Sequence, residues 1–409
     1  MSGFVRELAG RTEALDYVSK TLGFPWRLET QTKTLGESFG RRIGVPLSSL
    51  SDYPPFSRST RDGYALRSQD IAGASDSAPV FLRIKGEVLM GEPSDACVNE
   101  GECLGVHTGG MIPEGSDAVV MLEDTLKAGD WLEVRKSLQS GENVIFKGEE
   151  IGKGQMILET GERLDQRNVG ILATLGICEA DLMNLRIGIL STGDEIVPAE
   201  TRKLPSGKIR DANSWFLEYL LSEHGFSSSR LGIAPDRKDD LEKAVREGLV
   251  RHEVLLISGG SSVSVRDYCS EILEGLPSPG LLVRGINMSP GKPVLIAGCL
   301  PERRLVVGLP GHPLSCSIVA LTVLLPLLYA LAVTRATPLK SHRFPLARDI
   351  FGRTGVEEFI PVLVSEGKAV PLPGKSGYVS ILREAVGLVR LPQNEETRRK
   401  GETVEVLEW

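Results

Sequence analysis

Four acidic residues follow predicted strand ends or begin predicted helices within residues 186–333: Asp194, Glu195, Asp211 and Asp267. Acidic oxygens that converge with glycine loops suit a hard cation such as Mg²⁺, which commonly bridges carboxylate and phosphate. Each residue could instead cap a helix, and capping alone is the simpler explanation for Asp211, which begins DAN before a predicted helix. The group indicates a magnesium and phosphate site more strongly than any one member does.

Three short apolar runs break off into loops of small residues, in the stretches VLLISGGSSVSVRDY, GINMSPGKPVLIAG and RLVVGLPGHPLSC. Glycines let the backbone approach an anion, and Pro313 suits the first position of a helix whose free N–H groups attract phosphate. Lys292 adds a cation, and the loop STGDE follows a further strand, RIGIL. The loop residues that we expect at a phosphorylated ligand are Ser191, Thr192, Gly193, Asp194, Ser258, Gly259, Gly260, Ser261, Ser262, Ser289, Pro290, Gly291, Lys292, Pro310, Gly311 and His312.

These loops need a sheet to hold them at one edge. Residues 254–257 are too short a run for a helix and rich in branched side chains, which predicts a buried strand. Helices are predicted over 213–225, with Asn213 as the cap, and over 239–251. Alternating strands and helices predict a mainly parallel sheet covered on both faces, with ligands at its carboxyl edge.

Residues 314–334 carry no charge, so a membrane span is an alternative for this stretch. Because it follows a strand and a glycine loop, and contains Pro326 and several hydroxyl side chains, we expect instead a helix buried between the sheet and a neighbouring domain. The sequence therefore predicts no membrane contact.

The segment 80–138 has short alternating apolar runs, and Gly129-Asp130 is typical of a hairpin turn, so this segment is predicted to be all β. Asp62 lies in DYPPFSRSTRDGYA, where a turn could hold its carboxylate outward. Thr108 lies between a strand and two glycines, as a second point where the backbone could approach a ligand. For both, a plain surface loop is the alternative, and Glu149 and Glu150 would by default be solvated.

Length and composition point to about three soluble domains, since the chain has 409 residues, 41% of them hydrophobic and 25% charged. The net charge of −7 argues against a nucleic-acid partner. Six scattered cysteines without a CxxC motif, and the absence of a secretory signal, predict reduced thiols in the cytoplasm. No GxGxxG after a strand and no GxxxxGK[ST] is present, which excludes the usual dehydrogenase and P-loop nucleotide sites.

The order of several phrases resembles the molybdopterin molybdenumtransferase family, which includes the E domain of gephyrin, over nearly the whole chain. The matching phrases are PPFSRSTRDGYA, HTGGMIPEGSDAVVM, GENVIFKGEEI, STGDEIV, DANSWFL, SGGSSVSVRDY, SPGKP and GLPGHPLSC. Three positions differ from the usual family wording: Arg61 replaces a small apolar residue, Ser264 a glycine and Ser289 a lysine.

The resemblance implies an α/β multidomain fold: a mainly parallel β/α sandwich domain over 179–334, an all-β inserted domain over 49–145, a connector domain over 1–48 and 146–178, and a C-terminal small β-barrel over 335–409. It implies insertion of molybdate into adenylylated molybdopterin with Mg²⁺ and release of AMP. The implied catalytic residues are Asp62, Thr108, Glu150, Glu195, Asp211, Asp267 and Lys292, with Glu195, Asp211 and Asp267 as metal ligands.

The resemblance also implies a homodimer whose sites combine two subunits, and transient contacts with the adenylyltransferase and with apo molybdoenzymes. Two alternatives stay open. The related adenylyltransferase uses a similar β/α domain but is usually a lone domain, so the extra residues on both sides favour the molybdenumtransferase. A cofactor carrier or scaffold would keep the fold and bind the pterin without releasing AMP.

Overall fold

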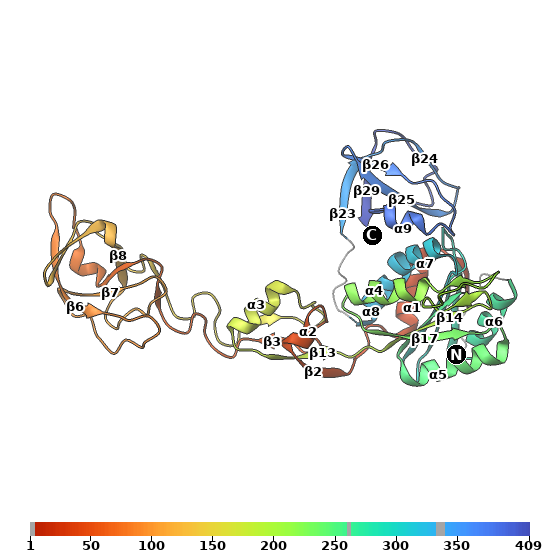
Figure 1. Ribbon diagram of the computed structural model, residues 1–409, viewed down its shortest axis with the longest axis horizontal. Helices are drawn as coiled ribbons and strands as arrows, with labels where there is room; N and C mark the ends of the chain where they lie inside the picture. Colours follow the sequence, from red (N-terminus) through yellow and green to blue (C-terminus); the bar gives the residue numbers. More distant parts are fainter. Residues whose placement is uncertain (1–4, 260–262, 333–339) are drawn as a thin grey trace. The chain divides into compact units, whose positions relative to one another are not determined.

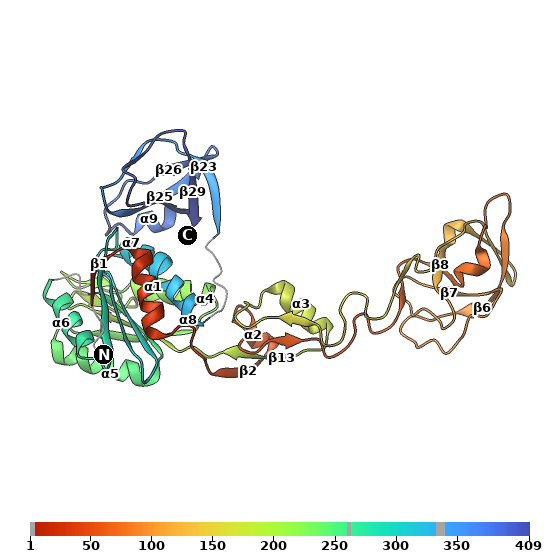
Figure 2. The same cartoon turned by 180° about the vertical axis from the view of Figure 1, so that it is seen from behind.

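The computed structural model describes residues 5–259, 263–332 and 340–409, with only the backbone described for 263–266. The chain separates into two compact units. The first comprises Met1–Val45, Thr160–Val169 and Glu179–Trp409, and the second Pro46–Glu159 and Gly170–Cys178. Figures 1 and 2 show their elements from two opposite sides.

The first unit is built on a sheet that has, within the described ranges, seven strands in the order β1–β19–β21–β22–β18–β14–β17. Strands β17, β14, β18 and β22 are parallel neighbours, whereas β21 runs antiparallel to β19 and β22. The predicted mainly parallel sheet is confirmed. The strands are β1 (Arg6–Ala9), β14 (Ile187–Thr192), β17 (Ser228–Ala234), β18 (Val254–Gly259), β19 (Pro279–Ile286), β21 (Leu295–Cys299) and β22 (Arg304–Leu309).

Successive residues of the central strands enter two separate cores. Ile189 and Leu256 pack on one face with α1 (Arg11–Leu22), α4 (Asn213–Glu223), α7 (Pro313–Val319) and α8 (Leu325–Ala332). Leu190 and Leu255 pack on the other face with α5 (Lys238–Arg251) and α6 (Val263–Glu274). Because both faces are covered, the strands are apolar throughout, as expected for parallel strands between helices.

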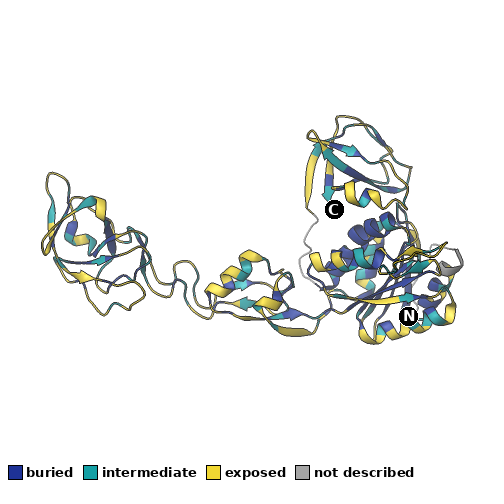
Figure 3. Cartoon of the chain, in the orientation of Figure 1, coloured by how far each residue is buried: buried dark blue, intermediate teal, exposed yellow. Residues whose placement is uncertain are grey.

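The uncharged stretch after β22 forms α7, a π-helical turn η3 (Ala320–Leu324) and α8. Pro313–Ala332 has the length and composition of a membrane span, but 89% of its most apolar window is buried inside the fold, and Figure 3 shows α7 and α8 in dark blue. Pro326 has no N–H to offer Thr322, four residues earlier, and Arg11 donates to that carbonyl oxygen instead, at 3.3 Å. The expectation of a buried core helix is confirmed.

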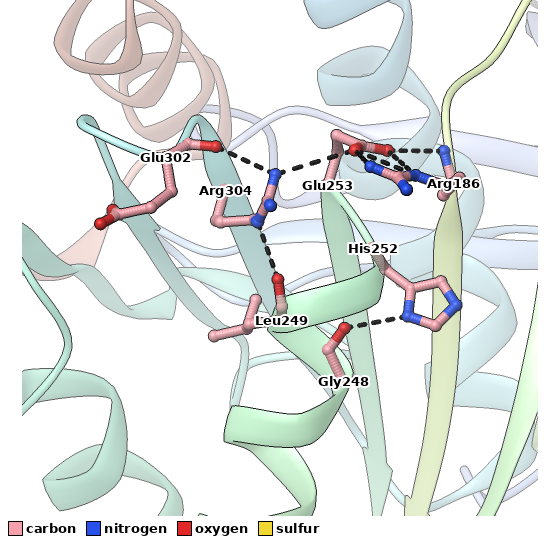
Figure 4. A network of polar contacts seen from close by, with 7 residues as sticks. All are labelled: Arg186, Gly248, Leu249, His252, Glu253, Glu302 and Arg304. Carbon is pink, nitrogen blue, oxygen red and sulfur yellow. Dashed lines mark hydrogen bonds and ion pairs between the residues drawn. The ribbon is translucent and has the colours of Figure 1, made fainter.

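The amino-terminal edge of the sheet is held by an ion-pair network (Figure 4). Glu253, just before β18, pairs with Arg186, just before β14, and lies 3.7 Å from Arg304 in β22. Arg304 Nε also donates to the Leu249 carbonyl at 2.8 Å. Burial raises the pKa of Glu253, but its bonds to Arg186 outweigh burial and leave the pKa lowered. Ion pairing thus holds the edge opposite the predicted ligand loops.

The connector elements lie on both sides of the insert in sequence. β2 (Thr30–Thr34) pairs with β13 (Glu179–Met183), and β3 (Leu47–Ser48) with β12 (Met156–Leu158). α2 (Leu35–Ser38) and α3 (Gln166–Thr174) accompany them. Asp165 accepts the Asn168 N–H at 3.0 Å and so caps α3. β1 and α1, which the sequence grouped with the connector, belong to the large sheet domain, since β1 pairs with β19.

The second unit contains the predicted all-β insert. Its sheet runs β8–β5–β7–β6–β10–β9, and the β9–β10 hairpin turns at Gly129 (φ 62°) and Asp130, as predicted. A smaller pair joins β4 (Arg58–Ser59) to β11 (Val144–Ile145). The main strands are β5 (Gly63–Leu66), β6 (Val80–Glu87), β7 (Glu102–Val106), β8 (Ala118–Met121), β9 (Thr125–Ala128) and β10 (Trp131–Val134).

The C-terminal domain is mostly antiparallel sheet. Its buried Glu357 (3% exposed) pairs with Arg11 at 2.8 Å and with Arg390, so an ion-pair triad joins this domain to α1. All six cysteines are free thiols, as their scatter predicted. The strands are β20 (Met288–Ser289), β23 (Ser341–Pro345), β24 (Ile350–Phe351), β25 (Glu357–Ser365), β26 (Lys368–Pro371), β27 (Gly387–Leu391), β28 (Thr397–Arg398) and β29 (Thr403–Glu408), with the short helix α9 (Ser380–Glu384).

Candidate active site

The carboxyl ends of β14, β18 and β22 meet at one edge of the sheet. Thr192 pairs with Gly259 and Ser258 with Leu309, so the loops that begin at 193, 260 and 310 leave from neighbouring positions. Gly259 has φ 132°, and a Cβ there would lie 2.0 Å from the Thr192 carbonyl oxygen, so only glycine allows the strands to approach this closely. Gly260, Ser261 and Ser262 lie outside the described residues.

Asp211 ties the end of β14 to the start of α4. The Ser191 hydroxyl donates to Asp211 Oδ2 at 2.7 Å, and the Ser214 N–H donates to Oδ1 at 3.1 Å. The carboxyl side chain is nearly buried, with the residue 9% exposed. Asp211 therefore performs the capping role that the sequence offered as one explanation, and each oxygen keeps one further lone pair for a ligand.

Asn213 does not cap α4, so that prediction was wrong. It is the first residue of the helix, and its amide Nδ2 donates to Ser258 Oγ and to the Gly311 carbonyl, both at 2.9 Å. Asp211, two residues earlier, accepts the Ser214 N–H of the first turn instead. The Asn213 side chain is therefore available for other bonds. Asn213 thereby joins the end of β18 to the loop that follows β22, which nothing in its sequence position revealed.

The loop after β14 is more open. Glu195 is exposed, and Asp194 accepts the Asp236 N–H at 3.2 Å, while Lys208 donates to the Asp194 carbonyl. Asp236, which the sequence did not single out, also accepts from Thr192 Oγ1 at 2.9 Å. A pocket of about 690 Å³ lies over this loop, with Asp194 and Asp211 in its wall.

The predicted metal ligands are not assembled into a metal centre. Over the described parts of the chain, no three His, Cys, Asp or Glu side chains are grouped as a metal site requires. Asp267 lies exposed on α6. Asp211 is bound within the protein on both oxygens, and Glu195 points from an exposed loop. These donors fit a magnesium ion that takes most of its ligands from water and substrate phosphate, which is how proteins usually hold it.

A second pocket of about 630 Å³ is lined by Ser289, Pro290, Gly291, Lys292 and the loop 310–312. The exposed Lys292 ammonium makes no ion pair with any described residue. The α7 start is less available than expected, because the Leu314 N–H donates to the Ser376 carbonyl at 3.2 Å. Pro313 has no N–H, and the Cys316 N–H donates to the His312 carbonyl at 2.8 Å, so Ser315 is left as the N–H donor of the first turn.

The C-terminal domain contributes to this second pocket, although no signal in its sequence indicated chemistry. Ser376 Oγ lies 2.9 Å from His312 Nδ1, and Arg353, paired with Glu358 at 2.9 Å, also lines the wall. Arg284, in the preceding strand β19, could supply a second cation beside Ser289, but it is engaged by Glu274 and Glu7. Unlike Arg284 and Arg353, which are held in ion pairs, Lys292 is therefore available to bind an anion.

Comparison with known proteins covers nearly the whole chain. Family models match at residues 11–176 (MoeA N-terminal region, domains I and II), 188–330 (probable molybdopterin binding domain) and 343–409 (MoeA C-terminal region, domain IV). A putative molybdopterin biosynthesis protein of Methanocaldococcus jannaschii is 32% identical over 90% of each chain. The chain belongs to the MoeA family of molybdenum cofactor biosynthesis enzymes.

Other relatives of this MoeA-family chain agree. A molybdopterin molybdenumtransferase of Staphylococcus aureus is 28% identical and spans 92% of this chain and 90% of its own. A crystal structure of a molybdopterin biosynthesis MoeA protein from Pyrococcus horikoshii matches with a TM-score of 0.83 and 31% identity, over 98% of this chain and 99% of the other. The multidomain α/β fold predicted from the sequence is confirmed.

The remaining site residues of the MoeA resemblance lie in the second unit. Asp62 Oδ1 accepts the Thr108 N–H at 2.9 Å and lies 3.4 Å from His107 Nδ1. The other ring nitrogen of His107 lies 2.5 Å from Glu87 Oε1. The Thr108 N–H is the main cause that lowers the pKa of Asp62; burial opposes it, and His107 adds to the lowering. Asp62 is thus held in its ionised form.

His107 and Glu87 were not singled out from the sequence, although HTGG contains His107 beside Thr108. Both line a pocket of about 310 Å³ with Asp62 and Lys127. Glu150 lies elsewhere in this unit and pairs with Arg58 at 3.0 Å, while 48% of its side chain stays exposed. The structure therefore joins Asp62 and Thr108 directly but does not bring Glu150 into their hydrogen-bond network.

Proposed function

We propose that this MoeA-family protein inserts molybdate into the dithiolene of adenylylated molybdopterin and releases AMP. The observation that carries the proposal is the hydrogen bonding of Asn213, which joins the end of β18 to the loop after β22 at the carboxyl edge. Asp211 fixes the end of β14 to the same helix start. Ligands bind at this edge in doubly wound sheets, so the network makes a preorganised wall for the pterin and its nucleotide.

Lys292 would bind the phosphates of the substrate, with Ser289 and the 310–312 loop supplying neutral donors around it. Asp211, Asp267 and Glu195 are proposed as the carboxylates that hold Mg²⁺. When bound, magnesium would neutralise phosphate charge as the P–O bond to AMP breaks. Each Asp211 oxygen already accepts one hydrogen bond, from Ser191 or from Ser214, and would offer the magnesium ion only its second lone pair. Water and phosphate oxygens would therefore supply the other magnesium ligands.

Asp62 and Thr108 are proposed to hold molybdate, with Glu150, elsewhere in the same unit, as a further acidic group. One oxo group of molybdate can leave as water by taking up the two protons that the dithiolene thiols release as their sulfurs bind molybdenum. The Thr108 N–H keeps Asp62 ionised, so this carboxylate is a poor proton donor near neutral pH. We therefore favour a cation between Asp62 and the oxyanion over direct proton donation.

The insert residues and the sheet-edge residues would form one site by pairing two subunits of a homodimer, as the family resemblance implies. The protein would act in the cytoplasm, where six free thiols are stable. There it would meet the adenylyltransferase that makes its substrate and the apo molybdoenzymes that receive its product. These contacts are transient in the proposal.

The deciding experiment mixes pure protein with adenylylated molybdopterin, Mg²⁺ and molybdate or tungstate. We expect release of AMP together with activation of an apo molybdoenzyme, and loss of both when a chelator removes Mg²⁺. Binding of the pterin without AMP release would instead identify a carrier. Formation of adenylylated molybdopterin from molybdopterin and ATP would identify an adenylyltransferase.

Variants of the SPGKP loop test the phosphate assignment in the same assay. Lys292→Ala should weaken substrate binding by about 10- to 100-fold, since a charge-assisted bond is lost but solvent already screens this exposed ammonium. Ser289→Lys should tighten binding and steepen its dependence on salt. Lys243→Ala, on the outer face of α5, is the matched control. Wild-type binding by Lys292→Ala would refute the assignment.

A further inference from the structure

A third pocket, of about 600 Å³, lies in the first unit where the segment after α2 meets the end of α4 and the start of β17. Its wall includes Arg41, Arg163 and the hydroxyl residues Ser222, Ser227 and Ser228. None of these residues belongs to the predicted site. The pocket is distinct from the one beside Lys292, because the two share no lining residue.

The pocket has a cluster of positive charge without a matching acid. Arg42 lies buried behind it, with its guanidinium bound to the carbonyl oxygens of Gly161 at 2.7 Å and His224 at 2.8 Å. Arg163 donates to the Gly40 carbonyl at 3.1 Å. Among the residues that the structure describes, no carboxylate lies within ion-pair distance of Arg41, Arg42 or Arg163.

The positive charge of this cluster changes the pKa of a neighbouring histidine. Burial, followed by the charges of Arg42 and Arg163, lowers the pKa of His224 to about 4. Burial also lowers the pKa of Arg41. The acids in the wall do not cancel the charge, since Glu218 is paired with Arg230 at 2.9 Å and only Glu223 is left over.

Two polar atoms in the wall lack partners. Arg41 Nε and Ser228 Oγ are both buried and make no hydrogen bond to any described residue. A buried donor without a partner costs about 1–3 kcal/mol, so such atoms are uncommon unless a ligand or water satisfies them. Two in one pocket, one of them on an unpaired guanidinium, indicate that an oxygen-rich anion completes the wall.

We propose that this pocket binds a small phosphate monoester. A dianion balances the surplus of about two positive charges, and guanidinium groups match phosphate oxygens in geometry. The pocket is larger than a phosphate group, and its rim carries the exposed rings of Phe39 and Tyr219, which are 59% and 66% exposed. These rings give a flat organic group a surface to pack on. The inference is independent of the proposed catalytic function.

Phenyl phosphate is the test ligand, measured by isothermal titration calorimetry in phosphate-free buffer at low salt. We expect the full-length wild-type protein to bind it with a Kd below about 1 mM and more tightly than inorganic phosphate or benzoate. Arg41→Gln should weaken binding at least about tenfold. Its fold should be unaffected, because the wild-type side chain makes no hydrogen bond that the change would remove.

Three further variants make the result decisive. Ser228→Ala should weaken binding several-fold. Arg167→Gln, at an exposed arginine already paired with Asp165 at 2.7 Å, should bind like wild type, and Lys292→Ala reports any binding in the other pocket. Absence of saturable binding by the wild type would overturn the proposal, because water alone would then satisfy Arg41. Binding that survives both Arg41→Gln and Ser228→Ala but not Lys292→Ala would overturn it too, by locating the ligand in the other pocket.

Discussion

Asp211 and Asp62 are both proposed to act on the substrate, yet they lie in opposite surroundings. Asp211 is nearly buried and holds Ser191 and the start of α4. Asp62 is exposed, and its contacts are the Thr108 N–H and His107. Asp211 therefore also stabilises the fold, whereas Asp62 is exposed and stays accessible to a ligand. Substitutions should separate the two roles.

The largest expected difference is in stability. Asp211→Ala removes two hydrogen bonds to a carboxylate and leaves buried donors unpaired, so we expect a loss of about 3–4 kcal/mol. Asp62→Ala should change stability by less than about 0.5 kcal/mol, as surface substitutions usually do. Denaturant unfolding of both variants measures this. Equal losses would mean that burial does not distinguish the two carboxylates.

The half-buried His224 makes the stability of the fold depend on pH. The pKa of His224 is lowered to about 4 from 6.5, so the unfolded chain takes up a proton at a pH where the folded protein does not. Its stability contribution is complete above pH 6.5 and is lost as pH falls from 6.5 to about 4, by at most about 3 kcal/mol.

His224→Gln should flatten the dependence of stability on pH in this window, measured by denaturant unfolding from pH 7 to pH 4. The wild-type protein measured over the same pH range gives the reference slope. An unchanged slope in His224→Gln would show that other groups cause the acid sensitivity.

Amide substitutions isolate the chemistry from the fold. Asp211→Asn can still accept the Ser214 N–H and meet the Ser191 hydroxyl, so stability should fall by no more than about 1 kcal/mol. If Asp211 and Asp267 serve magnesium, Asp211→Asn and Asp267→Asn should each lower Mg²⁺-dependent AMP release by about 100-fold. Wild-type turnover in both would leave Asp211 as a helix cap only.

The smallest effect concerns His107. Its ring lies between Asp62 and Glu87 and orients Asp62, while the Thr108 N–H holds the same oxygen independently. His107→Ala should therefore lower kcat about tenfold, with little change in KM for the pterin or in stability. Glu87→Gln, which keeps the shape, should have a weaker effect. A change in KM alone would assign His107 to substrate binding instead.

Much of the architecture followed from local patterns. The runs before SGGSS and STGDE were apolar on every residue, which identified strands covered on both faces, and Gly129-Asp130 identified the hairpin of the insert. The helical spacing of Leu241 and Val245 fits the predicted helix over 239–251, and both side chains are buried on one face of α5. Turn residues and hydrophobic spacing act over a few positions, so the sequence reports them directly.

The site was predicted less completely, because its contacts join residues far apart in the chain. Asn213 looked like a cap but reaches Ser258 and Gly311, and no local rule predicts such a bond. Ser376 reaches the Lys292 pocket from a domain without any chemical motif. Arg41 and Ser228 each look ordinary in the sequence. Only packing left both without partners in one pocket, because burial and hydrogen-bond satisfaction depend on the neighbours that the tertiary fold supplies.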